Sequence, residues 1–441
     1  MRETIIQFGE GVFLRGFFND FLNTLNQSGL YDGKAVVIQP RAGGKVAKLN
    51  EQNCRYHLFL RGIENGEPMA EHREIRSISR GIDPYKDFAA YMTLADSADI
   101  RFVVSNTTEA GIAFDDSCKL TDTPCLSFPG KLTQLLYRRY QNGLNGFIFL
   151  PCELIDNNAA ALKACILRYA DLWELEQGFI DWIENKNTFA NTLVDRIVTG
   201  YPEAEKETML AEIGCEDLYL NTAERFGLWV IEGNFEEELP LQKAGIPVIW
   251  TNDASPYKKR KVRVLNGAHT STVFPALLGG VETVGEAMAH PAVRALLEKN
   301  LYAHILPMLG ETQENLAFTA AVLDRFSNPY IRHKWQAISL NSISKFTVRV
   351  LPTMLDCKAA RGDYPKSLVF SLACLIRYYK ENDVSDDPTL TAKIKTGDIK
   401  EILADTALWG CDLSDACDAV HEALAIMKEK SMEEAIAWAI S

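Results

Sequence analysis

The feature that most constrains the fold is a change of pattern part-way along the 441-residue chain. Before residue 252, short runs rich in β-branched and aromatic residues alternate with helical stretches, which is typical of a parallel sheet covered by helices. We expect strands at residues 4–8, 35–38, 101–105, 146–150, 228–232 and 247–251. The sequence therefore predicts an α/β domain over residues 1–251.

The second part of the chain is predicted to be mostly helical. Apolar residues recur there at spacings of three and four, which indicates amphipathic helices. Ser255-Pro256 has the form of an N-cap followed by a first-turn proline, and the stretch before it is rich in turn formers. We therefore expect an α-helical domain over residues 252–441, with helical stretches at 255–279, 283–309, 312–326, 330–355 and 368–382 and an exposed loop at 381–387.

Charge and cysteine usage exclude several classes of protein. The formal net charge is −13, which disfavours nucleic acid and anionic membranes as partners. The ten cysteines form no C-x-x-C pair, and no apolar stretch approaches the roughly 18 residues of a membrane span. No H-x-x-x-H, H-E-x-x-H or G-x-S-x-G pattern is present, so neither a metal site nor a serine hydrolase is predicted. We expect a cytoplasmic protein with reduced thiols; the sequence does not fix its oligomeric state.

A glycine turn follows the first predicted strand. Gly9 can adopt the positive φ of a tight turn, and Gly11 lets backbone N–H groups approach a pyrophosphate. The match to G-x-G-x-x-G is imperfect, because Leu14 stands at the third position and Gly16 comes two residues late. The pattern favours a Rossmann-like dinucleotide site, and a bare glycine turn is the alternative.

Other segments follow predicted strands at what should be the ligand-binding edge of the sheet. They are residues 106–108 and 151–153. The second strand ends without the acidic residue that grips the ribose of NAD, and Arg41 could instead meet the extra phosphate of NADP. These residues alone do not distinguish NAD from NADP.

The most informative segment is the basic run at residues 255–269. In a helix, His269 lies at about 80° and Asn266 at about 140° from Lys261, so one face carries all three. A lysine acid, an amide donor to a developing alkoxide and a histidine that orients a hydroxyl suit carbonyl reduction. The alternative is a solvated basic helix with one packed histidine. Nucleic-acid binding is disfavoured, because no aromatic platform accompanies the basic run.

A charged pair, Asp195-Arg196, interrupts an apolar run. Such partly buried charges need partners. We expect either a role in the site or a salt bridge that joins the sheet domain to the helical one.

Taken together, these segments resemble the polyol-specific long-chain dehydrogenases, the mannitol dehydrogenase family, over nearly the whole chain. A K-x-x-x-x-N-x-x-H signature after an N-terminal G-x-G-x-F-x-R is specific to that family. The resemblance is carried by residues 7–15 (QFGEGVFLR), 105–111 (SNTTEAG), 151–156 (PCELID), 193–202 (LVDRIVTGYP), 256–258 (PYK), 261–269 (KVRVLNGAH), 325–329 (RFSNP) and 344–345 (SK).

The resemblance implies metal-free, NAD-dependent hydride transfer. Lys261 would be the general acid/base, Asn266 the oxyanion stabiliser and His269 a substrate-positioning residue. The implied cofactor-binding residues are Phe8, Gly9, Gly11, Phe13, Arg15, Asn106, Thr107, Glu109 and Asp195. The implied substrate-binding residues are Lys345, Lys258 and Asn157.

One departure bears on the substrate. Family members that act on mannitol carry Cys-Asp-Asn after the fourth strand, whereas this chain has Leu154 in place of the asparagine, so Asn266 acts alone with a water or Asn157 substitutes. The CELID and VTGYP segments resemble the branch that interconverts D-tagaturonate and D-altronate in galacturonate breakdown. A carboxylate substrate needs local positive charge, for which Arg332, Arg349 and Lys258 are candidates.

Three alternatives stay open. Reduction of fructuronate differs from that of tagaturonate only in the configuration of a hydroxyl. Mannitol or mannitol-phosphate oxidation comes next. From another class, a dinucleotide-binding regulatory protein would keep the fold without turnover.

Overall fold

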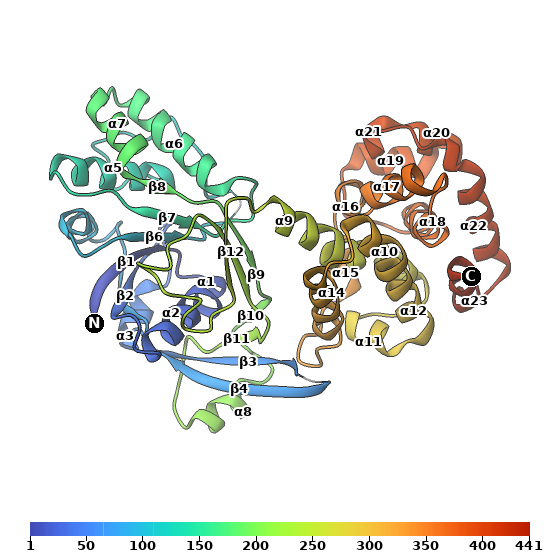
Figure 1. Cartoon of the computed structure of the whole chain (residues 1–441), viewed down its shortest axis with the longest axis horizontal. Coiled ribbons are helices and arrows are strands. Elements are labelled where there is room, and N and C mark those ends of the chain that lie inside the picture. Colours follow the sequence, from blue (N-terminus) through green and yellow to red (C-terminus); the bar gives the residue numbers. More distant parts are fainter. Residues whose placement is uncertain (65, 109) are drawn as a thin grey trace. The chain divides into compact units, whose positions relative to one another are not determined.

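The computed structural model describes residues 1–64, 66–108 and 110–441, and the chain divides into two compact units (Figure 1). The N-terminal unit comprises Met1–Arg61 and Met69–Ala254, and the C-terminal unit comprises Gly62–Pro68 and Ser255–Ser441. The domain boundary that we expect at 251/252 stays a prediction.

A six-stranded parallel sheet forms the centre of the N-terminal unit. Its order is β5-β2-β1-β6-β7-β8, which is 3-2-1-4-5-6 when its strands alone are numbered along the chain. This is the order of a Rossmann fold, so the predicted fold class is confirmed. The strands are β1 Arg2–Phe8, β2 Gly33–Ile38, β5 Ile78–Ile82, β6 Phe102–Ser105, β7 Ile148–Pro151 and β8 Thr188–Phe189.

Helices cover both faces of this sheet because successive side chains of a strand point to opposite faces. On β1, Ile5 packs into one apolar cluster, and Ile6 and Phe8 pack into another. The first cluster includes side chains of α2, and the second includes side chains of α5 and α6. The helices of this unit are α1 Val12–Gly16, α2 Phe18–Gln27, α3 Val46–Glu51, α4 Phe88–Met92, α5 Phe128–Gln141, α6 Asn158–Leu172, α7 Gln177–Lys186 and α8 Lys206–Ile213, with the 3-10 turn η1 Thr93–Asp96.

The remaining strands form two further sheets. Strands form at 228–232 and 248–251, close to the predicted places, but they belong to the three-stranded sheet β13-β12-β9 instead of the parallel sheet. The four-stranded sheet β10-β11-β3-β4 was not predicted. The strands are β3 Tyr56–Glu64, β4 Glu67–Ile75, β9 Thr192–Asp195, β10 Val198–Gly200, β11 Asn221–Glu224, β12 Leu228–Glu232 and β13 Val248–Thr251.

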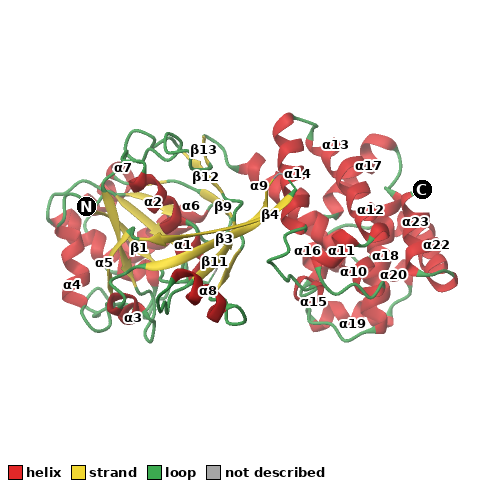
Figure 2. Cartoon of the chain, turned by 90° about the horizontal axis from the view of Figure 1, so that it is seen from below, coloured by secondary structure: helices red, strands yellow, loops and turns green. Residues whose placement is uncertain are grey.

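Residues 255–441, all of them described, form helices and loops with a single isolated bridge between Thr283 and Lys334 (Figure 2). No helix of the described residues is long and apolar enough to cross a membrane. The elements are α9 Ser255–Lys261, the π-helix η2 Val262–Asn266, α10 Gly267–Leu278, α11 Val284–Ala289, α12 Pro291–Lys299, the π-helix η3 Asn300–Ile305, α13 Leu306–Leu309, α14 Gln313–Phe326, α15 Trp335–Ile338, α16 Ser342–Arg349, α17 Leu351–Arg361, α18 Lys366–Glu381, α19 Pro388–Thr396, α20 Ile399–Ala404, α21 Thr406–Trp409, the 3-10 turn η4 Ser414–Ala416, α22 Cys417–Glu429 and α23 Met432–Ile440.

Two of the predicted helical stretches are broken. The stretch at 283–309 is interrupted at His290, which precedes Pro291 and therefore adopts ψ 111°. The stretch at 330–355 is divided by Asn341, whose left-handed φ of 53° ends one helical turn before the next begins. Periodicity predicted a mostly helical second part correctly, but it predicted neither these breaks nor the separate helices after residue 387.

Candidate active site

The turn after β1 has the geometry that its glycines predict. Gly9 adopts φ +116°, and a Cβ there would lie 2.7 Å from the carbonyl oxygen of Asn106, so a side chain does not fit. Gly11, at φ −65°, has no neighbouring atom within 4 Å of the place where its Cβ would stand. The backbone at Gly11 is therefore accessible to a bound group, and the turn fits a dinucleotide pyrophosphate.

The helix after this turn is shorter than expected. α1 has five residues, and Phe17, with φ −126° and ψ −84°, separates it from α2. So short a helix aligns few peptide dipoles. Individual backbone N–H groups, and not the dipole of a long helix, are thus what this turn offers to a phosphate.

Three side chains around the turn serve the fold. Phe8 is buried in the core, and Phe13 stacks on Phe17 with ring centroids 5.1 Å apart. Cofactor contact by these two residues stays a prediction. The buried guanidinium of Arg15 donates to the carbonyl of Tyr219 at 2.6 Å and lies over two tyrosine rings. Cofactor contact by the Arg15 side chain stays a prediction; its observed contacts position the turn.

A buried carboxylate connects the ends of β6 and β7. Glu153 accepts hydrogen bonds from the Ser105 hydroxyl at 3.0 Å and from the Thr107 N–H and hydroxyl at 2.9 and 3.0 Å. Burial raises the pKa of Glu153, and these hydrogen bonds act in the opposite direction. Asn106 donates to the Cys152 carbonyl at 2.7 Å. Glu153 thus fixes the loop that carries two of the predicted cofactor-binding residues, a role that sequence reasoning missed.

A cavity of about 420 Å³ lies at this same sheet edge, lined by Asn106, Thr108, Ala110 and Leu154. The strand order reverses between β1 and β6, because β2 lies on one side of β1 and β6 on the other. Open α/β sheets bind ligands at such a point, and the cavity lies beside it. Leu154 is 61% exposed. Asn157, at left-handed φ 52°, does not line the cavity, and its proposed substitution for the missing amide stays a prediction. Glu109 lies outside the described residues.

The Asp195-Arg196 pair lies in the N-terminal unit. Arg196 forms a buried ion pair with Asp20 at 2.8 Å and donates to the carbonyl of Gly16, both within the N-terminal unit. Arg196 thus has a carboxylate partner inside its own unit, and the salt bridge that we expect from the pair stays a prediction. Asp195 is 3% exposed at the end of β9, and its contact with the cofactor stays a prediction.

Lys261, Asn266 and His269 lie on one continuous helical segment of the C-terminal unit. Lys261 ends α9, Asn266 ends the π-helix η2, and His269 lies in the first turn of α10. The predicted angles of Asn266 and His269 from Lys261 assumed an α-helix throughout, and they are wrong because residues 262–266 form a π-helix. Each turn of a π-helix holds more residues, so Asn266 returns closer to the direction of Lys261 than 140°. Such π segments are frequent at functional sites.

His269 is buried against aromatic rings. It is 9% exposed, stacks on Phe326 with centroids 4.1 Å apart, and meets the rings of His333 and Trp335 edge-on. Its Nε2 has no hydrogen-bond partner among the described residues. Burial, together with the charges of His333, Arg325 and Arg349, holds the pKa of His269 well below its usual value. The imidazole is therefore neutral, with one buried nitrogen left to bond a ligand.

The other basic residues predicted around the substrate lie on two helices and a loop. Lys345, on α16, donates to the Ile338 carbonyl at 2.9 Å, and burial lowers its pKa. Lys258 is partly buried on α9. Arg332 is 73% exposed and lies 4.0 Å from Glu282.

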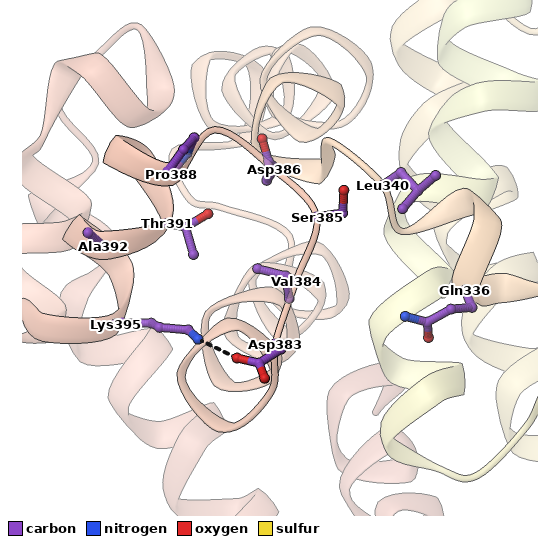
Figure 3. Close-up of a pocket in the computed structure, with 10 residues that line it drawn as sticks. All are labelled: Gln336, Leu340, Asp383, Val384, Ser385, Asp386, Pro388, Thr391, Ala392 and Lys395. Carbon is purple, nitrogen blue, oxygen red and sulfur yellow. Dashed lines mark hydrogen bonds and ion pairs between the residues drawn. The ribbon is translucent and has the colours of Figure 1, made fainter.

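A second hollow, of about 690 Å³, lies along the loop between α18 and α19 (Figure 3). None of the predicted site residues lines it. Its charged groups are used by the fold: Lys395 pairs with Asp383 at 3.2 Å, and Asp386 accepts from the Tyr379 hydroxyl and the Ile343 N–H. These charged groups therefore hold the loop in place, whereas the buried Thr391 hydroxyl bonds to no described residue.

One cluster among the described residues has metal-ligand spacing in space. Cys118, Asp122 and Cys125 have ligand atoms within 4.8 Å of one another. Burial raises the pKa of the Cys125 thiol, and buried Lys131 donates to the Cys125 carbonyl at 2.7 Å. A neutral thiol beside an ammonium group opposes cation binding. All ten cysteines are free thiols.

Comparison with known proteins decides the family. Residues 3–243 match the mannitol dehydrogenase Rossmann domain, and residues 253–429 match the mannitol dehydrogenase C-terminal domain. This chain belongs to the mannitol dehydrogenase family.

The relatives of this mannitol dehydrogenase family member include proteins named altronate oxidoreductase. The Bacillus subtilis (strain 168) protein is 44% identical over 94% of this chain and 89% of its own length. The Yersinia enterocolitica protein is 42% identical over 99% of this chain and 96% of its own length.

Two solved structures share the fold. A D-sorbitol dehydrogenase in substrate-free form has a TM-score of 0.88 at 24% identity, covering 99% of this chain and 95% of that one. Pseudomonas fluorescens mannitol 2-dehydrogenase, in a ternary complex with NAD and D-mannitol, has a TM-score of 0.73 at 23% identity, covering 99% and 94%.

Proposed function

We propose that this enzyme is an NAD-dependent oxidoreductase that interconverts D-tagaturonate and D-altronate in hexuronate breakdown. The observation that carries the proposal is the joint presence of Lys261, Asn266 and His269 in a chain that is 44% identical to an altronate oxidoreductase over 94% of its length. The open backbone at Gly11 and the cavity beside the Asn106 loop support a dinucleotide site in the N-terminal unit. Bound NADH supplies the hydride for the substrate's ketone carbon.

The chain's own residues supply the proton and the orientation. We propose that Lys261 gives a proton to the carbonyl oxygen as that oxygen gains negative charge, and takes a proton back in the reverse direction. The amide of Asn266 donates a hydrogen bond to the same oxygen and stabilises it. His269, kept neutral by burial, bonds a substrate hydroxyl through Nε2 and fixes the orientation of the sugar acid. We further propose a cytoplasmic location, in line with ten unpaired cysteines.

A spectrophotometric assay at ~340 nm, the absorption band of reduced nicotinamide, tests the proposal. Tagaturonate, fructuronate, fructose and fructose 6-phosphate are each offered with NADH and with NADPH. We expect the highest kcat/KM with tagaturonate and NADH. A higher value with fructuronate would make the protein a fructuronate reductase, and an equal or higher value with fructose would contradict the sugar-acid assignment. NADH binding without turnover of any substrate would favour a regulatory protein.

A further inference from the structure

Two cationic side chains share one face of α16. Lys345 and Arg349 are four residues apart on this helix, so they lie one above the other. α16 packs against α10, the helix that carries His269. The approach is close, because a Cβ on Gly267 of α10 would lie 3.0 Å from the Arg349 carbonyl oxygen. The helix that carries Lys345 and Arg349 thus packs beside the helix that carries His269.

The charges of Lys345 and Arg349 act on the pair of histidines that includes His269, which indicates that these groups lie near one another. The charge of Arg349 contributes to the lowered pKa values of both His269 and Lys345. Burial and then the charge of Lys345 lower the pKa of His333, whose ring meets His269 edge-on at 5.5 Å. The acidic group that acts on Lys345 is Asp386, which already accepts from the Tyr379 hydroxyl at 2.6 Å and the Ile343 N–H at 3.0 Å.

Arg349 differs from Arg263 in forming no ion pair with the described residues of its unit. Its partly buried guanidinium forms no hydrogen bond or ion pair with the described residues of the C-terminal unit. Arg263, by contrast, pairs with Asp356 at 3.1 Å and donates to Thr353. Burial lowers the pKa of Arg349, and no carboxylate opposes that effect. A partly buried charge of this kind is stabilised by an anion.

We propose that Arg349 determines the specificity for sugar acids by binding the substrate carboxylate through its planar, two-pronged guanidinium. The inference rests on the proposed function, and it adds the residue that separates acidic from neutral ketoses. The planar guanidinium fork matches the geometry of a carboxylate. The buried Nε2 of His269 then has a substrate hydroxyl as its partner. Of the other candidates, Lys345 is bonded to the Ile338 carbonyl and Arg332 is 73% exposed beside Glu282.

The test compares an acidic and a neutral ketose in matched variants. Wild type, Arg349→Gln and Arg349→Lys are assayed with D-tagaturonate and with D-tagatose, which lacks the carboxylate. We expect Arg349→Gln to lower kcat/KM for tagaturonate by about 100-fold or more, chiefly through KM, and to change it for tagatose by less than about 3-fold. Arg349→Lys should retain an intermediate value, because it keeps the charge but loses the fork. An equal loss with both substrates, or no loss, would overturn the inference.

The matched control is Arg294→Gln, which removes an exposed guanidinium of α12 from the same unit. The control should leave kcat/KM for both substrates unchanged. A loss of kcat/KM confined to tagaturonate in this control would overturn the assignment to Arg349. If Arg349→Gln does not fold, the methyl ester of tagaturonate with wild type and Arg349→Lys replaces it. With wild type, the ester should have only a small fraction of the kcat/KM of tagaturonate. With Arg349→Lys, the difference between the two substrates should be much smaller.

The outcomes separate the inference from the proposed function. If wild type turns over tagaturonate well but Arg349→Gln does not discriminate between the two ketoses, the inference alone fails. If wild type does not turn over tagaturonate, the proposed function fails, and the carboxylate assignment fails with it.

Discussion

The imidazole of His269 lies flat on the ring of Phe326, with centroids 4.1 Å and planes 14° apart, while its buried Nε2 bonds to no described residue. Stacking therefore orients the ring without using its polar edge. This arrangement allows packing and polar function to be tested separately, because an apolar ring of similar size can take the same place.

His269→Phe should fold with nearly wild-type thermal stability, because it keeps the stack on Phe326 and removes no hydrogen bond of Nε2. It should lower kcat/KM for the sugar acid by about 10²-fold or more, because the bond to a substrate hydroxyl is lost. NADH binding, followed by fluorescence, should be unchanged. Steady-state kinetics and thermal unfolding check these expectations, and His421→Phe, at an exposed position, is the control. Retention of full activity would remove His269 from the site.

Lys261→Ala should abolish most turnover and leave NADH affinity nearly unchanged. Loss of a general acid lowers kcat by about 10²- to 10⁴-fold. Lys259→Ala removes an exposed lysine of the same helix, and it should retain wild-type kcat. Single-turnover measurements of NADH oxidation distinguish a slow chemical step from slow product release. If Lys261→Ala and Lys259→Ala had equal rates, another group would have to supply the proton.

Gly9→Ala and Gly11→Ala should separate folding from cofactor binding. At Gly9 the positive φ of 116° and the contact at 2.7 Å with the Asn106 carbonyl oppose any side chain, so we expect a loss of about 1–3 kcal/mol in the free energy of unfolding. Gly11 has an ordinary φ of −65° and open surroundings. Gly11→Ala should therefore keep its stability and weaken NADH binding by about tenfold or more, because the methyl group stands where the pyrophosphate approaches. Calorimetric unfolding and NADH titration measure the two effects. Unaltered NADH affinity in Gly11→Ala would contradict the assignment of the pyrophosphate site to Gly11.

Glu153→Gln should weaken both the fold and the cofactor site. The amide replaces one carboxylate oxygen by a donor, so one of the donors on Ser105 or Thr107 loses its acceptor, at a cost of about 1–3 kcal/mol. We expect a lower melting temperature and a higher KM for NADH, with a smaller change in KM for the sugar acid. Asp171→Asn, an exposed acidic residue on α6, serves as the control and should change neither value.

The sequence predicted those features that depend on local patterns. The Gly9 turn, the alternation of strands and helices in the first part and the helical second part all follow from residues close together in the chain. The strand β4 was missed because its residues are mostly polar and exposed, which leaves no apolar alternation to detect. The π-helix at 262–266 was missed because an i+5 hydrogen-bond pattern leaves no distinct apolar spacing.

Tertiary contacts explain the rest of what could not be predicted. The sequence identified His269 and placed Arg349 among three basic candidates, but only the packing of α16 on α10 and the exposure of Arg332 separate Arg349 from Arg332. Glu153 likewise acts on Ser105 and Thr107, which lie more than forty residues earlier. A charged residue two positions after a buried strand was the one available signal for Glu153.

Stability should fall in weak acid because several histidines are held neutral. Burial and the charges of Arg361 and Lys299 lower the pKa of His304 to about 4, and the pKa values of His269 and His333 are also lowered. Histidines in the unfolded chain have a pKa of about 6.5, so below that pH they bind protons that the same histidines do not bind in the folded chain. The stability that His304 contributes is therefore complete above pH 6.5 and is lost progressively as the pH falls towards about 4.

His304→Asn should consequently show a shallower decline of the urea midpoint between pH 6.5 and pH 4 than wild type shows. At pH 8 the variant should be less stable than wild type, by about 1–2 kcal/mol, because a buried ring and its 3.3 Å contact with Arg361 are lost. The two stability curves therefore approach each other on acidification. His421→Asn, at an exposed position on α22, should run parallel to wild type over the same range. If His304→Asn also ran parallel to wild type, the acid sensitivity would have to come from other groups, with His269 and His333 the first to substitute.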